Sequence, residues 1–184
     1  MKKLNVVLIT LLALIPQIVW GDVITNYGQY SLKDDGDNHT ATFTLAFDKA
    51  GIIITDHVVY NNTVYTVTAI GEEAFKNCKD LLTLDIPSTV TDIHENAFNG
   101  APIAKITVDT NNETYQAIDS VLFTKSSKTL ICYPANKKTS KYTVTSDVYG
   151  IQQNAFKNCK YLQTLYFSNT LVSEGTIDFS TVKA

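Results

Sequence analysis

The sequence contains no arginine, so all 15 of its basic residues are lysines, set against 18 aspartate and glutamate residues. Proteins that bind nucleic acid contact its phosphates and guanine edges mainly through arginine-rich surfaces. A formal net charge of −3 adds no attraction for a polyanion. Both features argue against a nucleic acid as the partner of this chain.

Long apolar runs are also scarce, and the longest lies near the N-terminus at Leu4–Ile15, behind two lysines. It is shorter than the about 20 apolar residues of a membrane-spanning helix, although a membrane anchor is the alternative interpretation. Gly21 follows as the small residue of a cleavage site. This layout predicts a secretory signal peptide at residues 1–21. We therefore expect a secreted or cell-surface protein with no transmembrane segment in its mature chain.

Catalytic and metal-binding motifs are missing as well. The three histidines show no metal-ligand spacing such as H-E-x-x-H, and no G-x-S-x-G nucleophile motif occurs. Cys132 with a distant histidine would be a candidate nucleophile, but its alternation with Leu130 and Pro134 favours a packing role. We expect no catalytic residue, no cofactor and no metal, and hence no enzyme. A secreted hydrolase is the least favoured alternative.

The sequence has an internal repeat. The string AFKNCK occurs at Ala74–Lys79 and again at Ala155–Lys160, and apolar residues with L-x-x-L-x-I spacing follow. Phe75 and Phe98 lie 23 residues apart, and a last, poorly preserved copy retains Phe179. A period of about 20 to 29 residues with this pattern is the signature of a leucine-rich repeat solenoid.

The repeat has a physical explanation, because one coil cannot bury its own apolar side and must stack on its neighbours. In the segment TLDI, strand alternation directs Leu84 and Ile86 inward and leaves the residues before each of them outward. The Ala–Phe pair fits a tight turn at the opposite edge of the coil. Cys78 and Cys159 take the same place in coils that are not adjacent, too far apart for a disulfide. We expect all three cysteines to be free.

At this level of detail the sequence resembles the BspA-like leucine-rich repeat family over Ile52–Leu171. Plain coils occupy Val64–Gly100. The family's inserted hairpin, N-x-x-Y-x-x-x-D-G-V-L-F, is matched at Asn112–Phe123, with Ser120 in place of the usual glycine. The resemblance implies a β-rich solenoid of coils of about 23 residues with a β-hairpin insertion. Ahead of it, the apolar–polar alternation of YGQYSL and HTATFTLAF predicts a β-rich N-terminal lead-in.

The chain is accordingly divided into three expected parts. Residues 1–21 form the signal peptide, residues 22–69 a β-rich lead-in that caps the first coil, and residues 70–184 the leucine-rich repeat domain. The hairpin insertion is expected near residues 111–145. Within the lead-in, Asn61–Asn62 tolerates positive φ and predicts a two-residue hairpin turn.

The family resemblance implies an exported protein that binds a protein or another extracellular macromolecule, as in adhesion to host or cell-surface molecules. The alternative is an architectural or assembly role in a bacterial envelope. Binding residues are expected at outward strand positions, unless these form a plain solvated face or the hairpin tip TKSSK binds instead. The partner-binding candidates are Thr83, Asp85, Lys105, Thr107, Lys141, Thr143, Thr164 and Tyr166.

Overall fold

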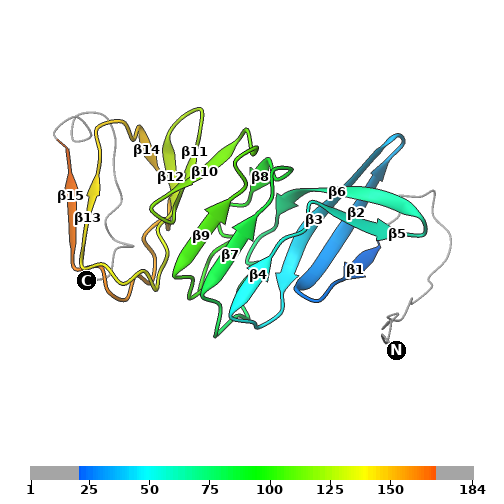
Figure 1. Ribbon diagram of the computed structural model, residues 1–184, viewed down its shortest axis with the longest axis horizontal. Helices are drawn as coiled ribbons and strands as arrows, with labels where there is room; N and C mark the ends of the chain where they lie inside the picture. Colours follow the sequence, from blue (N-terminus) through cyan, green and yellow to red (C-terminus); the bar gives the residue numbers. More distant parts are fainter. Residues whose placement is uncertain (1–20, 169–184) are drawn as a thin grey trace.

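The computed structural model describes residues 21–168 and shows an elongated stack of β-strands (Figure 1). Every regular element in this part of the chain is a strand. Successive coils lie side by side along the long axis of the molecule. The predicted β-rich solenoid, with repeats about 23 residues apart, is therefore confirmed. The last repeat around Phe179, and all but Gly21 of the expected signal peptide, lie outside the described residues.

A six-stranded sheet forms the N-terminal end of the stack. Its strands are β1 (Asp22–Ile24), β2 (Gly28–Asp35), β3 (Asn38–Ala46), β5 (His57–Tyr60), β6 (Thr63–Ile70) and β8 (Asp92–Ile93). β1, β2 and β3 form an antiparallel meander, and β5 and β6 form a hairpin. β3, β6 and β8 run parallel to one another, so they form one edge of successive coils.

The turn between β5 and β6 has the geometry that its two asparagines predict. Asn61 and Asn62 have φ angles of 47° and 64°, in the left-handed region where asparagine is tolerated better than most residues. Inside the sheet, the rings of Tyr30 and Phe43 meet edge to face at 5.1 Å, and both are fully buried. This apolar interior covers the first coil of the stack.

The opposite edge of the coils is a parallel sheet of three strands, β4 (Gly51–Ile53), β7 (Thr83–Ile86) and β9 (Lys105–Val108). On β7, Leu84 and Ile86 point into the core and are buried, as the alternation predicts. β4 pairs with β7 although it falls in the segment expected to be the lead-in. Parallel stacking thus begins before residue 70, and the domain boundary at that residue stays a prediction.

The Ala–Phe pairs lie in the turns that connect the two sheets, as Ala74 and Phe75 do between β6 and β7. Ala74 and Phe75 are fully buried, and the amide of Ala46 in the preceding coil donates a 2.7 Å hydrogen bond to the Ala74 carbonyl. The rings of Phe75 and Phe98 stack with their centroids 5.7 Å apart. The small alanine lets the coils approach, and the phenylalanine fills the space between them. Phe98 is only partly buried.

The inserted hairpin interrupts the stack after β9. β10 (Tyr115–Ile118) and β11 (Val121–Thr124) are joined by a two-residue turn, and β12 (Thr129–Cys132) lies antiparallel to β11. β12 then pairs in parallel with β14 (Gly150–Ile151), which restores the coil geometry. These strands include the hairpin that the family resemblance implies.

The parallel pairing of coils resumes on the outward edge with β13 (Lys141–Val144) and β15 (Thr164–Phe167). The hydrophobic core divides into two clusters where the hairpin enters. Asn112 joins the hairpin to the preceding coil, because its buried Nδ2 donates to the carbonyls of Pro87 and Val90 at 2.8 and 2.9 Å. These two side-chain hydrogen bonds thus hold the start of the insertion against the preceding coil.

Candidate functional site

The outward side of β7 and β9 carries four of the predicted binding residues. Parallel pairing places Thr83 beside Lys105 and Asp85 beside Thr107. Thr107 is partly buried and donates a hydrogen bond to the carboxylate of Asp85, whereas the other three side chains are exposed. The stacking of coils therefore forms a polar strand face from residues that are about one repeat apart in the sequence.

The other four predicted residues lie on β13 and β15. Lys141 pairs with Thr164, and Thr143 pairs with Tyr166. Tyr166 is 48% exposed. Thr164 is half-buried, and the two residues of β13 are exposed.

These two groups do not form one continuous face. Within residues 21–168, β9 and β13 belong to separate sheets, and β10 and β11 pack against β9 instead. The coils touch again on the turn side, where the amide of Asn136 donates to the carbonyl of Ile103 at 2.8 Å. The sequence pattern predicted the outward positions, but the structure divides them into two surfaces.

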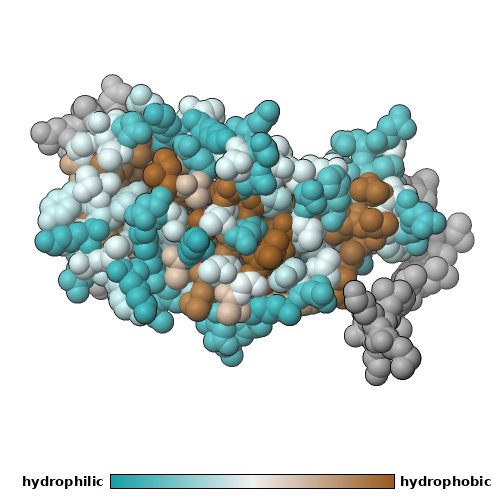
Figure 2. Space-filling model, viewed as in Figure 1, coloured by the Kyte–Doolittle hydropathy of each residue, from teal (hydrophilic) through white to brown (hydrophobic). Residues whose placement is uncertain are grey.

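A groove of about 490 Å³ crosses the C-terminal ends of β4, β7 and β9. Ile53 stands in register with Asp85, which in turn stands in register with Thr107. The side chain of Ile53 lines this groove next to Asp85 and is 48% exposed. In Figure 2, apolar residues gather in the middle of the visible face, where these strands lie, with hydrophilic residues around them.

The groove is acidic, because Asp56, Asp85 and Asp109 all line it. Sequence reasoning identified only Asp85 as a candidate. It missed Ile53 and Asp56 because the segment that contains them was assigned to the lead-in rather than aligned with TLDI. The segment GIIIT, an apolar run followed by a polar residue, is the sequence feature that indicates its alignment with TLDI.

A second cavity, of about 200 Å³, lies between the hairpin and the end of β13. Phe123 and Tyr142 line it, and burial raises the pKa of Tyr142 to about 12. At its edge, Lys128 forms an ion pair with Asp147 at 3.5 Å. Lys125 donates to the carbonyl of Asn112. Both lysines of the hairpin tip are therefore engaged within the molecule rather than projecting freely.

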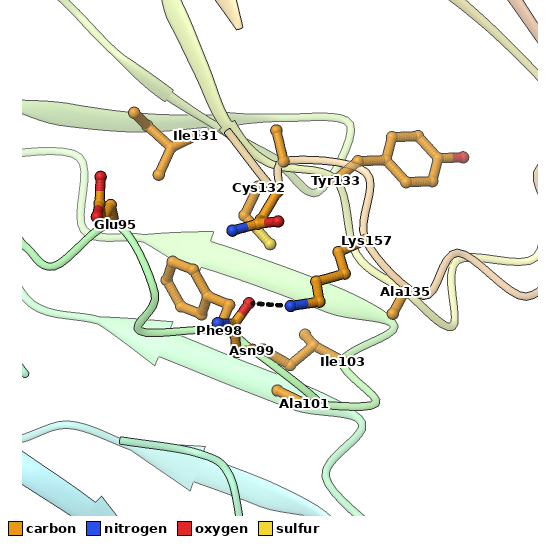
Figure 3. Close-up of a pocket in the computed structure, with 12 residues that line it drawn as sticks. Glu95, Phe98, Asn99, Ala101, Ile103, Ile131, Cys132, Tyr133, Ala135 and Lys157 are labelled. Atoms are coloured by element: carbon orange, nitrogen blue, oxygen red, sulfur yellow. Dashed lines mark hydrogen bonds between the residues drawn. The ribbon is translucent and has the colours of Figure 1, made fainter. Parts of the chain in front are cut away.

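A notch on the turn edge is too small to hold a ligand (Figure 3). Its volume is about 20 Å³, which is room for about one water molecule. Lys157 bridges it by donating to Asn99 at 3.4 Å, and Asn154 donates to Asn96 at 3.3 Å. The Cys132 side chain lines the notch.

The sequence model of the BspA type leucine rich repeat region matches the chain at residues 55–139 and 131–183, in six copies. The chain belongs to the BspA-type leucine-rich repeat family. The family resemblance stated from the sequence is thereby confirmed. A comparison with curated proteins found no match.

Solved structures of bacterial leucine-rich repeat proteins resemble this BspA-type chain in fold. A leucine-rich repeat protein of Bacteroides capillosus is 21% identical with a TM-score of 0.50, and the match covers 80% of this chain and 99% of that one. One from Bacteroides ovatus is 19% identical with a TM-score of 0.51, over 79% of this chain and 41% of that one. The pneumococcal vaccine antigen PcpA is 14% identical with a TM-score of 0.47, and the match covers 90% of this chain and 69% of that one.

The cysteines of the BspA-type coils are free and buried, as expected. Burial raises the pKa of Cys78 to about 11 and that of Cys159 to about 12, and it also raises the pKa of Cys132. Nucleophilic attack requires the thiolate, which is scarce at neutral pH when the pKa is raised. The chemistry of Cys132 therefore matches the packing role that its alternation predicts.

Titratable groups in the described coils make local structural contacts. His39 lies 3.0 Å from Asp34, and His57 lies 3.3 Å from Asp56. Within residues 21–168, no three His, Cys, Asp or Glu side chains gather closely enough to hold a metal ion. No helix in that part of the chain is long and apolar enough to cross a membrane.

Proposed function

We propose that this BspA-type chain is an exported, non-enzymatic repeat protein that binds another protein at a cell surface, as an adhesin does. The observation that carries the proposal is the pair of outward strand surfaces, on β7–β9 and on β13–β15, where side chains from successive coils stand in parallel register and six of the eight candidate residues are exposed. A rigid repeat stack with a broad surface suits a macromolecular partner. Family membership supports protein binding, and adhesion is the finer step that we add.

Tyr166 is the residue we expect to contribute most to this binding. A half-exposed tyrosine offers a large apolar contact with little loss of side-chain entropy. Its register partner Thr143 and the nearby Lys141 supply polar contacts around it. Such an arrangement, an aromatic anchor within a polar rim, is typical of residues that dominate binding energy.

Export is the second part of the proposal. β1 begins at Asp22, directly after the expected cleavage site, so removal of residues 1–21 would take away no strand residue and only the hydrogen bond from the Leu32 amide to the Gly21 carbonyl. The intact mass of the protein recovered from outside the producing cell tests this expectation. A mass that starts at Asp22 supports export with cleavage, and a mass that retains Trp20 contradicts it.

Paired substitutions separate the strand surface from the hairpin tip. We would measure binding of the full exported chain to immobilised extracellular-matrix and cell-envelope proteins. Asp85→Lys with Tyr166→Ala changes one residue on each of the two strand surfaces, and Lys125→Glu with Lys128→Glu alters the tip. Loss of binding with the first pair alone supports the proposal. Loss with the second pair alone would move binding to the tip, and indifference to both pairs would favour an architectural role.

A further inference from the structure

Charge is divided along the solenoid. Residues 22–119 carry 15 acidic residues and five lysines, whereas residues 120–168 carry one aspartate and seven lysines. The division falls at the two-residue turn between β10 and β11, near the boundary of the two hydrophobic clusters. The groove across β4, β7 and β9 lies wholly in the acidic part. A cation approaching that part of the molecule is therefore attracted before it makes any contact.

The carboxylates of the groove are not neutralised locally. Asp85 accepts from the Thr107 hydroxyl, and Asp109 accepts from the Asn111 amide at 2.8 Å. Asp56 lies beside His57. Among the described residues, no lysine forms an ion pair with any of the three aspartates. Their negative charge is available to a partner.

Apolar side chains line the groove beside these carboxylates. Ile53 is exposed there, and Pro87 and Val108 also line the groove. Apolar area that stays exposed in a hollow is a recurring mark of a binding site. The distance across three parallel strands is about 10 Å, which about three residues of an extended peptide would span. A volume of about 490 Å³ accommodates such a segment.

We propose that this groove binds an extended peptide segment of another protein, in which lysine or arginine side chains flank an apolar residue. The cationic side chains meet the carboxylates of Asp56, Asp85 and Asp109, and the apolar residue lies on Ile53. The proposal rests on the proposed protein-binding function and specifies the chemistry of the partner.

A short acetylated peptide of alternating lysine and isoleucine, labelled with fluorescein, is the probe. Fluorescence polarisation with the full chain at low salt gives its affinity. Two matched peptides replace every lysine with glutamate, or every isoleucine with serine. Binding of the first peptide at least about tenfold tighter than either matched peptide supports the proposal, and equal binding of the glutamate peptide overturns it.

The groove variant combines Asp56→Asn, Asp85→Asn and Asp109→Asn, which keeps the shape of each side chain and removes its charge. Each exposed carboxylate contributes about two- to fivefold in affinity at low salt. Together the substitutions should weaken peptide binding by about tenfold or more and flatten its salt dependence.

The matched control combines Asp35→Asn, Asp80→Asn and Asp92→Asn, which are exposed residues of the acidic part outside the groove. It removes the same net charge, so it should change affinity by no more than about twofold. Equal weakening by the two triple variants would assign the attraction to the overall field and overturn the groove as the site.

Two further measurements complete the test. Sedimentation without peptide reports self-association, and a dimer that the groove variant abolishes would assign the groove to a second copy of the chain and overturn the proposal. Cell-envelope binding that is lost with Tyr166→Ala but kept by the groove variant would also overturn it. That last result would leave the proposed function standing. If the unsubstituted chain bound neither the peptide nor any extracellular-matrix or cell-envelope protein, both the groove proposal and the proposed function would be wrong.

Discussion

Replacing Asn112 with alanine should loosen the attachment of the β10–β11 hairpin to the coil that precedes it. The side chain is fully buried, and its Nδ2 donates to the carbonyls of Pro87 and Val90. Its Oδ1 accepts from the amides of Thr114 and Tyr115 at 2.9 and 2.7 Å. Alanine leaves all four of these backbone groups without their side-chain partner.

The expected cost follows from those contacts. Four hydrogen bonds at about 1 kcal/mol each predict a loss of about 4 kcal/mol in the free energy of unfolding. A water molecule in the vacated space would satisfy some of the groups and reduce the loss. Single domains are stable by about 5 to 15 kcal/mol, so the variant should lose a large share of its stability.

Equilibrium unfolding in urea, followed by far-UV circular dichroism, measures this loss. Asn111→Ala is the matched control, because Asn111 is exposed and uses its backbone amide, not its side chain, in the contact to Asp109. The control should change stability by less than about 0.5 kcal/mol. A loss at Asn112 no larger than that of the control would refute the reasoning.

Asn112→Asp extends the test to pH. The carboxylate keeps the acceptor but faces two carbonyls, so burial and repulsion should raise its pKa in the folded state above the unfolded value. The folded state then binds the proton more tightly, and stability falls as pH rises through that window. Relative to the unsubstituted protein, this variant should be less destabilised near pH 4 than near pH 7.

Three further predictions concern packing, the hairpin turn and the thiols. Phe75→Ala should cost about 3 to 5 kcal/mol in urea unfolding, and Phe98→Ala clearly less, because Phe98 is only partly buried beside the notch. Ser120→Gly should raise the midpoint of thermal unfolding and stabilise by about 1 kcal/mol, because Ser120 has a φ of 69°. Alkylation of Cys78 and Cys159 near pH 8 should be slow until the protein unfolds, since burial raises both pKa values; fast labelling of the native protein would contradict this.

The architecture could be predicted from the sequence because a solenoid repeats its environment. Phe75 and Phe98 occupy equivalent turns, so the same sequence pattern recurs at the spacing of one coil. The strand alternation at Leu84 and Ile86 predicted which side chains point inward. The turn at Asn61–Asn62 was equally predictable, because its geometry depends on residues that are adjacent in the chain.

The candidate surface could be predicted only in part. Outward positions follow from the local alternation of a strand, and all eight predicted residues lie on β7, β9, β13 and β15. Their division into two surfaces depends on where the inserted hairpin packs. That packing is set by contacts of Asn112 with residues more than twenty positions away.

Local spacing by itself determined the repeat, the inward and outward positions, and the burial of the cysteines, because each of these follows from a pattern within one coil. Only the tertiary structure placed Ile53 beside Asp85 and joined Asp56 and Asp109 into one acidic groove. β4 shows only the short apolar run GIIIT of the repeat pattern, a signal too weak to identify its partner strand. Its register with β7 is set by backbone hydrogen bonds and core packing between residues about thirty positions apart, which no local pattern encodes.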